Sequence, residues 1–177
     1  MAGLTHLGVG LAAKPVASKI PLALLIVSAY AIDIIWGVFF LAGIERLSQP
    51  GMTVFNPWSH GLFMASVWSL LAGLLAWRIG GSRRTGVIIG LLVFSHWLVD
   101  FVSHPMTAVF PDDAGLPIFF ADAPLVGLGV WRTQLGVAIG EYGIFVLGLL
   151  IYLVTLRRLR RQKKAQLAHP SPVEAAD

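Results

Sequence analysis

Four long runs of apolar residues are spaced along the chain, with short polar or glycine- and proline-rich segments between them. They extend over about Ile20–Gly43, Pro57–Trp77, Gly86–His104 and Gln134–Leu156. Each run reaches the roughly 20 residues that a helix needs to cross a hydrocarbon core of about 30 Å. The pattern therefore predicts an all-α integral membrane protein with four transmembrane helices.

The segments between these runs complete the predicted organisation. Residues 1–13 are apolar but too short to span, and Lys14–Pro15 separates them from the first run, which predicts a short N-terminal helix that is interfacial or re-entrant. Residues 1–156 are predicted to form one bundle with external loops at 44–57 and 105–133. The second loop is long for a structureless connection, which favours a folded cap. Residues 157–177 are predicted to be a basic, partly disordered cytoplasmic tail.

Composition and charge fit this picture. Of 177 residues, 56% are hydrophobic and 12% are charged. Eleven of the 13 basic residues flank one side of the predicted spans, and only Arg46 and Arg132 fall in the loops on the other side. The positive-inside rule then places both termini in the cytoplasm. The basic C-terminal run is expected at the anionic lipid surface, so we expect membrane lipids and not nucleic acid as its partner.

The stretch "SHWLVDFVSH" places three ionisable groups inside the third apolar run. His96, Asp100 and His104 follow one another at intervals of four residues, so they lie along one face of a helix. A charged group at the centre of a bilayer costs at least about 2.5–3.5 kcal/mol and usually faces the interior of the bundle. The stripe is therefore a candidate functional site.

The other runs carry polar groups at similar depth. Asp33 lies in the first run, His60 at the start of the second and Glu141 in the fourth. Counting at 1.5 Å per residue puts them about 21–27 Å from the side on which the basic residues gather, and Asp100 at about 22 Å. His6 can join them only if the N-terminal segment folds back into the bundle.

Imidazole and carboxylate groups are the usual ligands of zinc and related divalent ions. The chain has no cysteine, which excludes thiolate ligands. A bound cation would offset the cost of burying the acids, and a carboxylate left over, Asp33 or Glu141, could act as a catalytic general base. The alternative is a purely structural role, in which single residues such as His96 or Glu141 only make hydrogen bonds between helices.

The order of short motifs resembles a known family. "THLGVGLAAKP", "AIDIIWG", "PWSHGL", "SHWLVDFVSHP" and "GLGVW", with a Glu in the last helix, are similar to the YdjM-like bacterial inner-membrane proteins described as metal-dependent hydrolases. The likeness covers about residues 5–155. It implies a multi-pass inner-membrane protein and metal-site positions at His6, Asp33, His60, His96 and Asp100, with His104 and Glu141 nearby. Many such proteins have D-x-D in the first span, where this chain has Asp33 and Ile35.

These observations leave three functions open. The leading hypothesis is a metal-dependent hydrolase, with zinc as the foremost cofactor, that acts on a lipid or lipid-linked ester or phosphoester. An ion- or proton-coupled transporter would also bury acids and histidines in a bundle. A haem-b cytochrome would use histidines on facing helices, and His60 and His104 nearly match in depth.

Overall fold

The computed structural model describes residues 3–46, 56–120 and 123–168, and it is mostly helical. The helices are α1 (Gly3–Ala12), α2 (Leu22–Ala29), α3 (Ala31–Leu41), α4 (Leu62–Gly80), α5 (Arg83–Ser103), α6 (Gln134–Val137) and α7 (Ile144–Ala168), with a 3₁₀ turn η1 (Val130–Arg132) and a π turn η2 (Ala138–Gly143). Strands β1 (Leu116–Pro117) and β2 (Leu125–Val126) pair antiparallel.

Within the described residues, three helices are long and apolar enough to cross a membrane, or four if the bent pair α2 and α3 counts as one span. They are α4, α5 and the continuous helix from α6 through α7. Their outward surfaces carry many exposed large apolar side chains, as expected for contact with lipid tails. This confirms the prediction of a mostly helical chain with long apolar helices that could span a membrane, and the short N-terminal helix is present as α1.

The first predicted span is not one straight helix. It breaks at Tyr30, and α2 and α3 meet at an angle of 56°. Helix α7 also continues through the basic run to Ala168, well past the predicted end of its span at Leu156. Part of the predicted loop 44–57 and the last residues of the tail lie outside the described residues.

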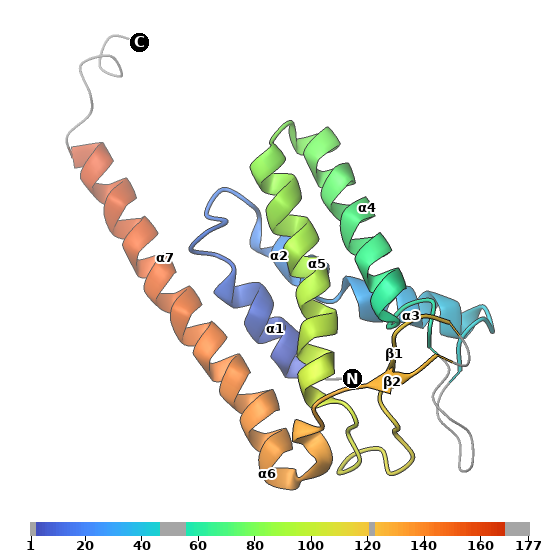
Figure 1. Cartoon of the computed structure of the whole chain (residues 1–177). Coiled ribbons are helices and arrows are strands. Elements are labelled where there is room, and N and C mark those ends of the chain that lie inside the picture. The colour runs from blue at the N-terminus through green and yellow to red at the C-terminus, as the bar shows by residue number, and fades with distance from the viewer. Residues whose placement is uncertain (1–2, 47–55, 121–122, 169–177) are drawn as a thin grey trace.

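Helix α5 occupies the centre of the bundle. It packs against α4 on one side and against α2, α1 and α3 on the others (Figure 1). Its boundaries follow from the sequence: Gly81 takes a left-handed conformation that ends α4, and the Ser82 hydroxyl accepts a hydrogen bond from the Thr85 N–H. Proline disfavours helical geometry in the residue that precedes it, so α5 ends before His104 and Pro105. The polar residues in the middle of α5, His96 and Asp100, are buried among these neighbouring helices.

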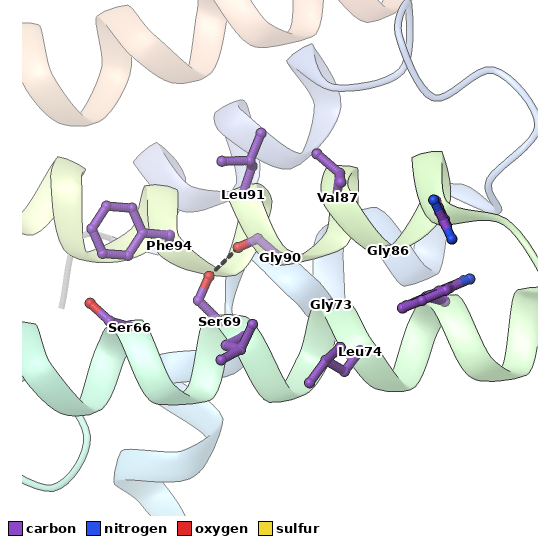
Figure 2. Close-up of a pocket in the computed structure, with 12 residues that line it drawn as sticks. Ser66, Ser69, Gly73, Leu74, Gly86, Val87, Gly90, Leu91 and Phe94 are labelled. Atoms are coloured by element: carbon purple, nitrogen blue, oxygen red, sulfur yellow. Dashed lines mark hydrogen bonds between the residues drawn. The ribbon is translucent and has the colours of Figure 1, made fainter.

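Small residues let α4 and α5 approach closely. Gly73 faces Gly86 and Gly90, where an added Cβ would lie within 3.1 Å of the opposite backbone. The Ser69 hydroxyl donates a hydrogen bond to the Gly90 carbonyl across the interface (Figure 2). Such small-residue contacts are a common way for helices to associate in membranes. They leave an apolar groove of about 660 Å³ that Leu74 also lines.

The N-terminal helix lies within the bundle, between α7 and α5 (Figure 1). Helix α1 begins beside Glu141, far from the turn between α4 and α5, whereas α7 finishes at the same end as that turn. The prediction that both termini share one side of the membrane is not supported by this placement of Gly3.

The crossing of α1 and α7 depends on two glycines. A Cβ added to Gly148 would lie 2.1 Å from the Gly8 carbonyl oxygen. We expect Gly148→Ala to lower the free energy of unfolding by about 1–3 kcal/mol, because α1 must move away from α7. Thermal melting of the detergent-purified protein measures this. The matched control is Gly37→Ala, where an added Cβ meets nothing within 4 Å; equal melting temperatures for the two variants would contradict the close packing of α1.

Candidate metal centre

Five ionisable side chains from separate parts of the chain meet inside the bundle. They come from α1, α3, the turn before α4, and α5, and they are His6, Asp33, His60, His96 and Asp100. Two overlapping groups of ligand atoms could each hold a metal ion. One comprises His6, His96 and Asp100, and the other comprises Asp33, His60 and His96. Only His96 belongs to both.

The distances within the cluster suit a shared cation. His60 Nε2 lies 3.4 Å from Asp33 Oδ1 and 3.5 Å from Asp100 Oδ2. His96 Nε2 lies 3.5 Å and 3.3 Å from the same two oxygens. These separations exceed those of ordinary N–H···O hydrogen bonds. Two ligands each about 2.1 Å from a zinc ion at the tetrahedral angle are about 3.4 Å apart.

The orientation of His96 is set by the backbone. Its Nδ1 lies 2.8 Å from the carbonyl oxygen of Ala29, at the end of α2 next to the break at Tyr30. A carbonyl oxygen can only accept a hydrogen bond, so Nδ1 must carry a proton. When the imidazole is neutral, its Nε2 bears a lone pair that faces Asp33 and Asp100. The broken helix thus presents a metal-binding nitrogen to the centre of the cluster.

A cation at this position would balance the charges of the buried acids. His6, His96 and Asp100 are each at most 2% exposed. Among the described residues, His6 Nε2, His96 Nε2 and Asp100 Oδ1 have no hydrogen-bond partner. Two carboxylates this close together in a buried site repel one another, and either protons on the imidazoles or a bound cation offsets that repulsion. The donor atoms therefore fit a divalent cation. The Asp33 side chain is 19% exposed and gives the cluster its access to the surroundings.

His6 reaches the cluster because α1 folds back. Its ring stacks on that of His96 at 3.7 Å, and its Nε2 lies 3.3 Å from Asp100 Oδ1. The carboxylate of Glu141 fixes the start of α1, where it accepts hydrogen bonds from the Leu4 N–H at 2.8 Å and the Thr5 hydroxyl at 2.8 Å. An acid at the N-terminus of a helix also interacts favourably with the helix dipole. The structure thus gives Glu141, predicted as a catalytic base, the role of a cap on α1.

His104 has a different partner. It ends α5 and lies with its Nδ1 2.7 Å from Asp113 Oδ2, and neither candidate ligand group contains it. Burial alone would raise the pKa of Asp113, but the hydrogen bond from His104 and those from the Met106 and Gly115 N–H groups lower that pKa below its ordinary value. Segment 105–133 is thus tied to α5, and it carries β1, β2 and η1 as a folded cap. Gly127 lies directly against the His104 carbonyl.

We expect His104→Ala to weaken this cap without removing a metal ion. The substitution leaves the buried Asp113 carboxylate without its imidazole partner, which costs about 3 kcal/mol and corresponds to a fall in melting temperature of roughly 6–12 °C for a chain of this size. Melting of the purified protein and metal analysis check both parts. Loss of the ion in this variant would return His104 to the set of ligands.

Two further residues adjoin the site: Glu45, which the sequence did not single out, and Ser59, which the sequence indicated only as part of the pair Ser59–His60. Glu45 follows α3 and is 1% exposed, and burial raises the pKa of its carboxyl group above the ordinary value while hydrogen bonds from Ser59 and Trp58 offset part of that rise. The Ser59 hydroxyl lies 2.6 Å from Glu45 and 2.8 Å from His60 Nδ1. The only signal in the sequence was the Ser-His pair at the start of the second run.

The histidine geometry does not suit a haem. The rings of His6 and His96 are stacked, and the ring of His60 lies 5.4 Å from that of His96. A macrocycle bound between two axial imidazoles needs the space that these rings and the two acids fill. His104, the depth-matched partner of His60, is held by Asp113.

No protein-family model matches this chain, and comparison with curated proteins and with solved structures found no similar protein. The resemblance to the YdjM-like family therefore stays a prediction. Any proposal about function therefore depends on the geometry of the site alone.

Proposed function

We propose that the chain is a membrane-embedded metal-dependent hydrolase that acts on a lipid or a lipid-linked ester or phosphoester. The observation that carries the proposal is the convergence of imidazole nitrogens and carboxylate oxygens from α1, α3, α5 and the turn before α4 at mutual distances of 3.3–3.5 Å. We take zinc as the ion, because imidazole and carboxylate donors are its usual ligands in catalytic sites.

The residues divide into two roles. His60, His96 and Asp100 would hold the ion, with His6 on the second oxygen of Asp100. Asp33 would contribute an oxygen and, as the most exposed of the acids, would accept a proton from the attacking water. A divalent ion bound here would supply Lewis acidity toward a carbonyl or phosphoryl oxygen and make water a better nucleophile.

The surroundings of the site support a lipid-like substrate. The helices that carry the ligands expose broad apolar surfaces, which suit a substrate that approaches from the hydrocarbon phase of the bilayer. Localisation in a bacterial inner membrane follows from the family resemblance and remains part of the proposal.

The test is hydrolysis by the purified protein in lipid nanodiscs. Fluorogenic acyl esters and phosphate esters with long alkyl chains would be supplied in the bilayer, with and without added zinc. We expect product release that is removed by a chelator and restored by zinc. Failure to find a stoichiometric divalent ion in wild-type protein, or turnover that is unaffected by chelation, would overturn the proposal.

A further inference from the structure

A chain of hydrogen bonds runs from Glu45 to the candidate metal centre. Glu45 Oε1 accepts the backbone N–H groups of Trp58 and Ser59 at 2.8 and 2.9 Å, and its Oε2 accepts the Ser59 hydroxyl at 2.6 Å. The Ser59 oxygen in turn lies 2.8 Å from His60 Nδ1. Glu45 and Ser59 are both fully buried, so water does not compete for these bonds.

The direction of these bonds is determined by the number of protons available. Ser59 has a single hydroxyl proton, and the Glu45 carboxylate in its ionised form can only accept, so that proton points to Glu45. The Ser59 oxygen must then accept a proton from His60 Nδ1. His60 is thereby held in the tautomer whose Nε2 is bare, and that Nε2 faces Asp33 and Asp100.

We propose that Glu45 is a positioning residue of the metal centre, which acts through Ser59 to fix the tautomer and ring orientation of His60. This inference rests on the proposed function. Partners of this kind, in contact with the far nitrogen of a ligating histidine, typically change metal affinity 10- to 100-fold. His96 has a backbone carbonyl in the equivalent position, so His60 is the ligand whose orientation depends on side chains.

Glu45→Gln is the most specific test, because it preserves the shape of the side chain and reverses the direction of the hydrogen bonds that run through Ser59. The two backbone N–H groups retain the amide oxygen, which leaves the amide N–H directed at Ser59. The Ser59 hydroxyl must then donate to His60 Nδ1, and the proton of the imidazole moves to Nε2, where it blocks metal binding. A residue with a merely structural role would tolerate this isosteric change.

The experiment has two readouts. Nitrogen NMR of histidine-labelled, metal-free protein reports which ring nitrogen of His60 is protonated, and competition with a zinc chelator gives the zinc dissociation constant. We expect Glu45→Gln to move the proton from Nδ1 to Nε2 and to weaken zinc binding about 10- to 100-fold. Ser59→Ala removes the acceptor for Nδ1 and should weaken binding within the same range.

Ser66→Ala is the matched control, since the Ser66 hydroxyl donates to the carbonyl of Leu62 on its own helix. It should leave both readouts unchanged. An unchanged His60 tautomer together with unchanged zinc affinity in Glu45→Gln would overturn the inference. If Glu45→Gln does not fold, Ser59→Ala decides by the same two measurements. The NMR result needs no bound ion, so it stands or falls separately from the hydrolase proposal.

Discussion

Wild-type protein purified in detergent should hold about one divalent ion per chain, and His96→Ala should hold less than about a tenth of that amount. His96 is the one residue that both candidate ligand groups share, and its Nε2 contacts both acids. Without it neither group keeps three donors, and the buried carboxylates of Asp33 and Asp100 lose the cation that balances them. Metal analysis of the protein after dialysis against metal-free buffer gives the numbers.

His104→Ala is the matched control, because it removes a histidine from the same helix eight residues further on. Its imidazole belongs to the cap and contacts Asp113, so the variant should keep its ion. Equal metal content in wild type and His96→Ala, or an ion lost from both histidine variants alike, would contradict the site as described.

The sequence predicted the helices well because their length and apolar character are set locally. The runs that became α4, α5 and α7 are long enough to span, and α4 and α5 end at glycine, serine or proline residues whose backbone preferences are strong. The pattern of apolar residues did not predict the bend at Tyr30. An apolar run looks the same whether the helix is straight or broken, and no proline or glycine stands at the break.

Depth along a helix predicted much of the cluster, but depth says nothing of direction around the helix. Asp33 and Asp100 have similar counted depths and lie in the same cluster, whereas the count separated His60 and His96 by about 11 Å, although their rings are 5.4 Å apart. His104 has a suitable depth, yet its backbone has already left the helical conformation, so the stripe of α5 ends before it. Glu141 likewise has the right depth but points to the start of α1.

The pattern of apolar and polar residues could not predict that Glu45 is buried beside the site. It lies after an apolar run and beside Arg46, where an acidic residue ordinarily faces water. Its burial results from the way the turn before α4 folds over it, with two backbone N–H groups and a hydroxyl directed at one carboxylate. Contacts of this kind depend on tertiary structure, which a single sequence does not display.

The two acids of the cluster should respond differently to the same substitution. In Asp33→Asn the amide oxygen can keep the position of Oδ1 toward His60 and His96, while the amide nitrogen points to the exposed side. The ion should therefore be retained with lower affinity. The amide cannot accept a proton, so hydrolysis at saturating zinc should fall by about 10²–10⁴-fold.

Asp100→Asn has no such arrangement. Asp100 Oδ1 faces His6 and Oδ2 faces His60 and His96, so an amide nitrogen meets an imidazole in either orientation. This buried position also loses the charge that balances the cation, and we expect the ion to be lost. Zinc content and hydrolysis rate, measured side by side, separate the two variants. Wild-type turnover in a zinc-loaded Asp33→Asn would make Asp33 a ligand only.

Absence of any hydrolysis, with proton flux into liposomes that Asp33→Asn abolishes, would instead make the same cluster the coupling site of a transporter.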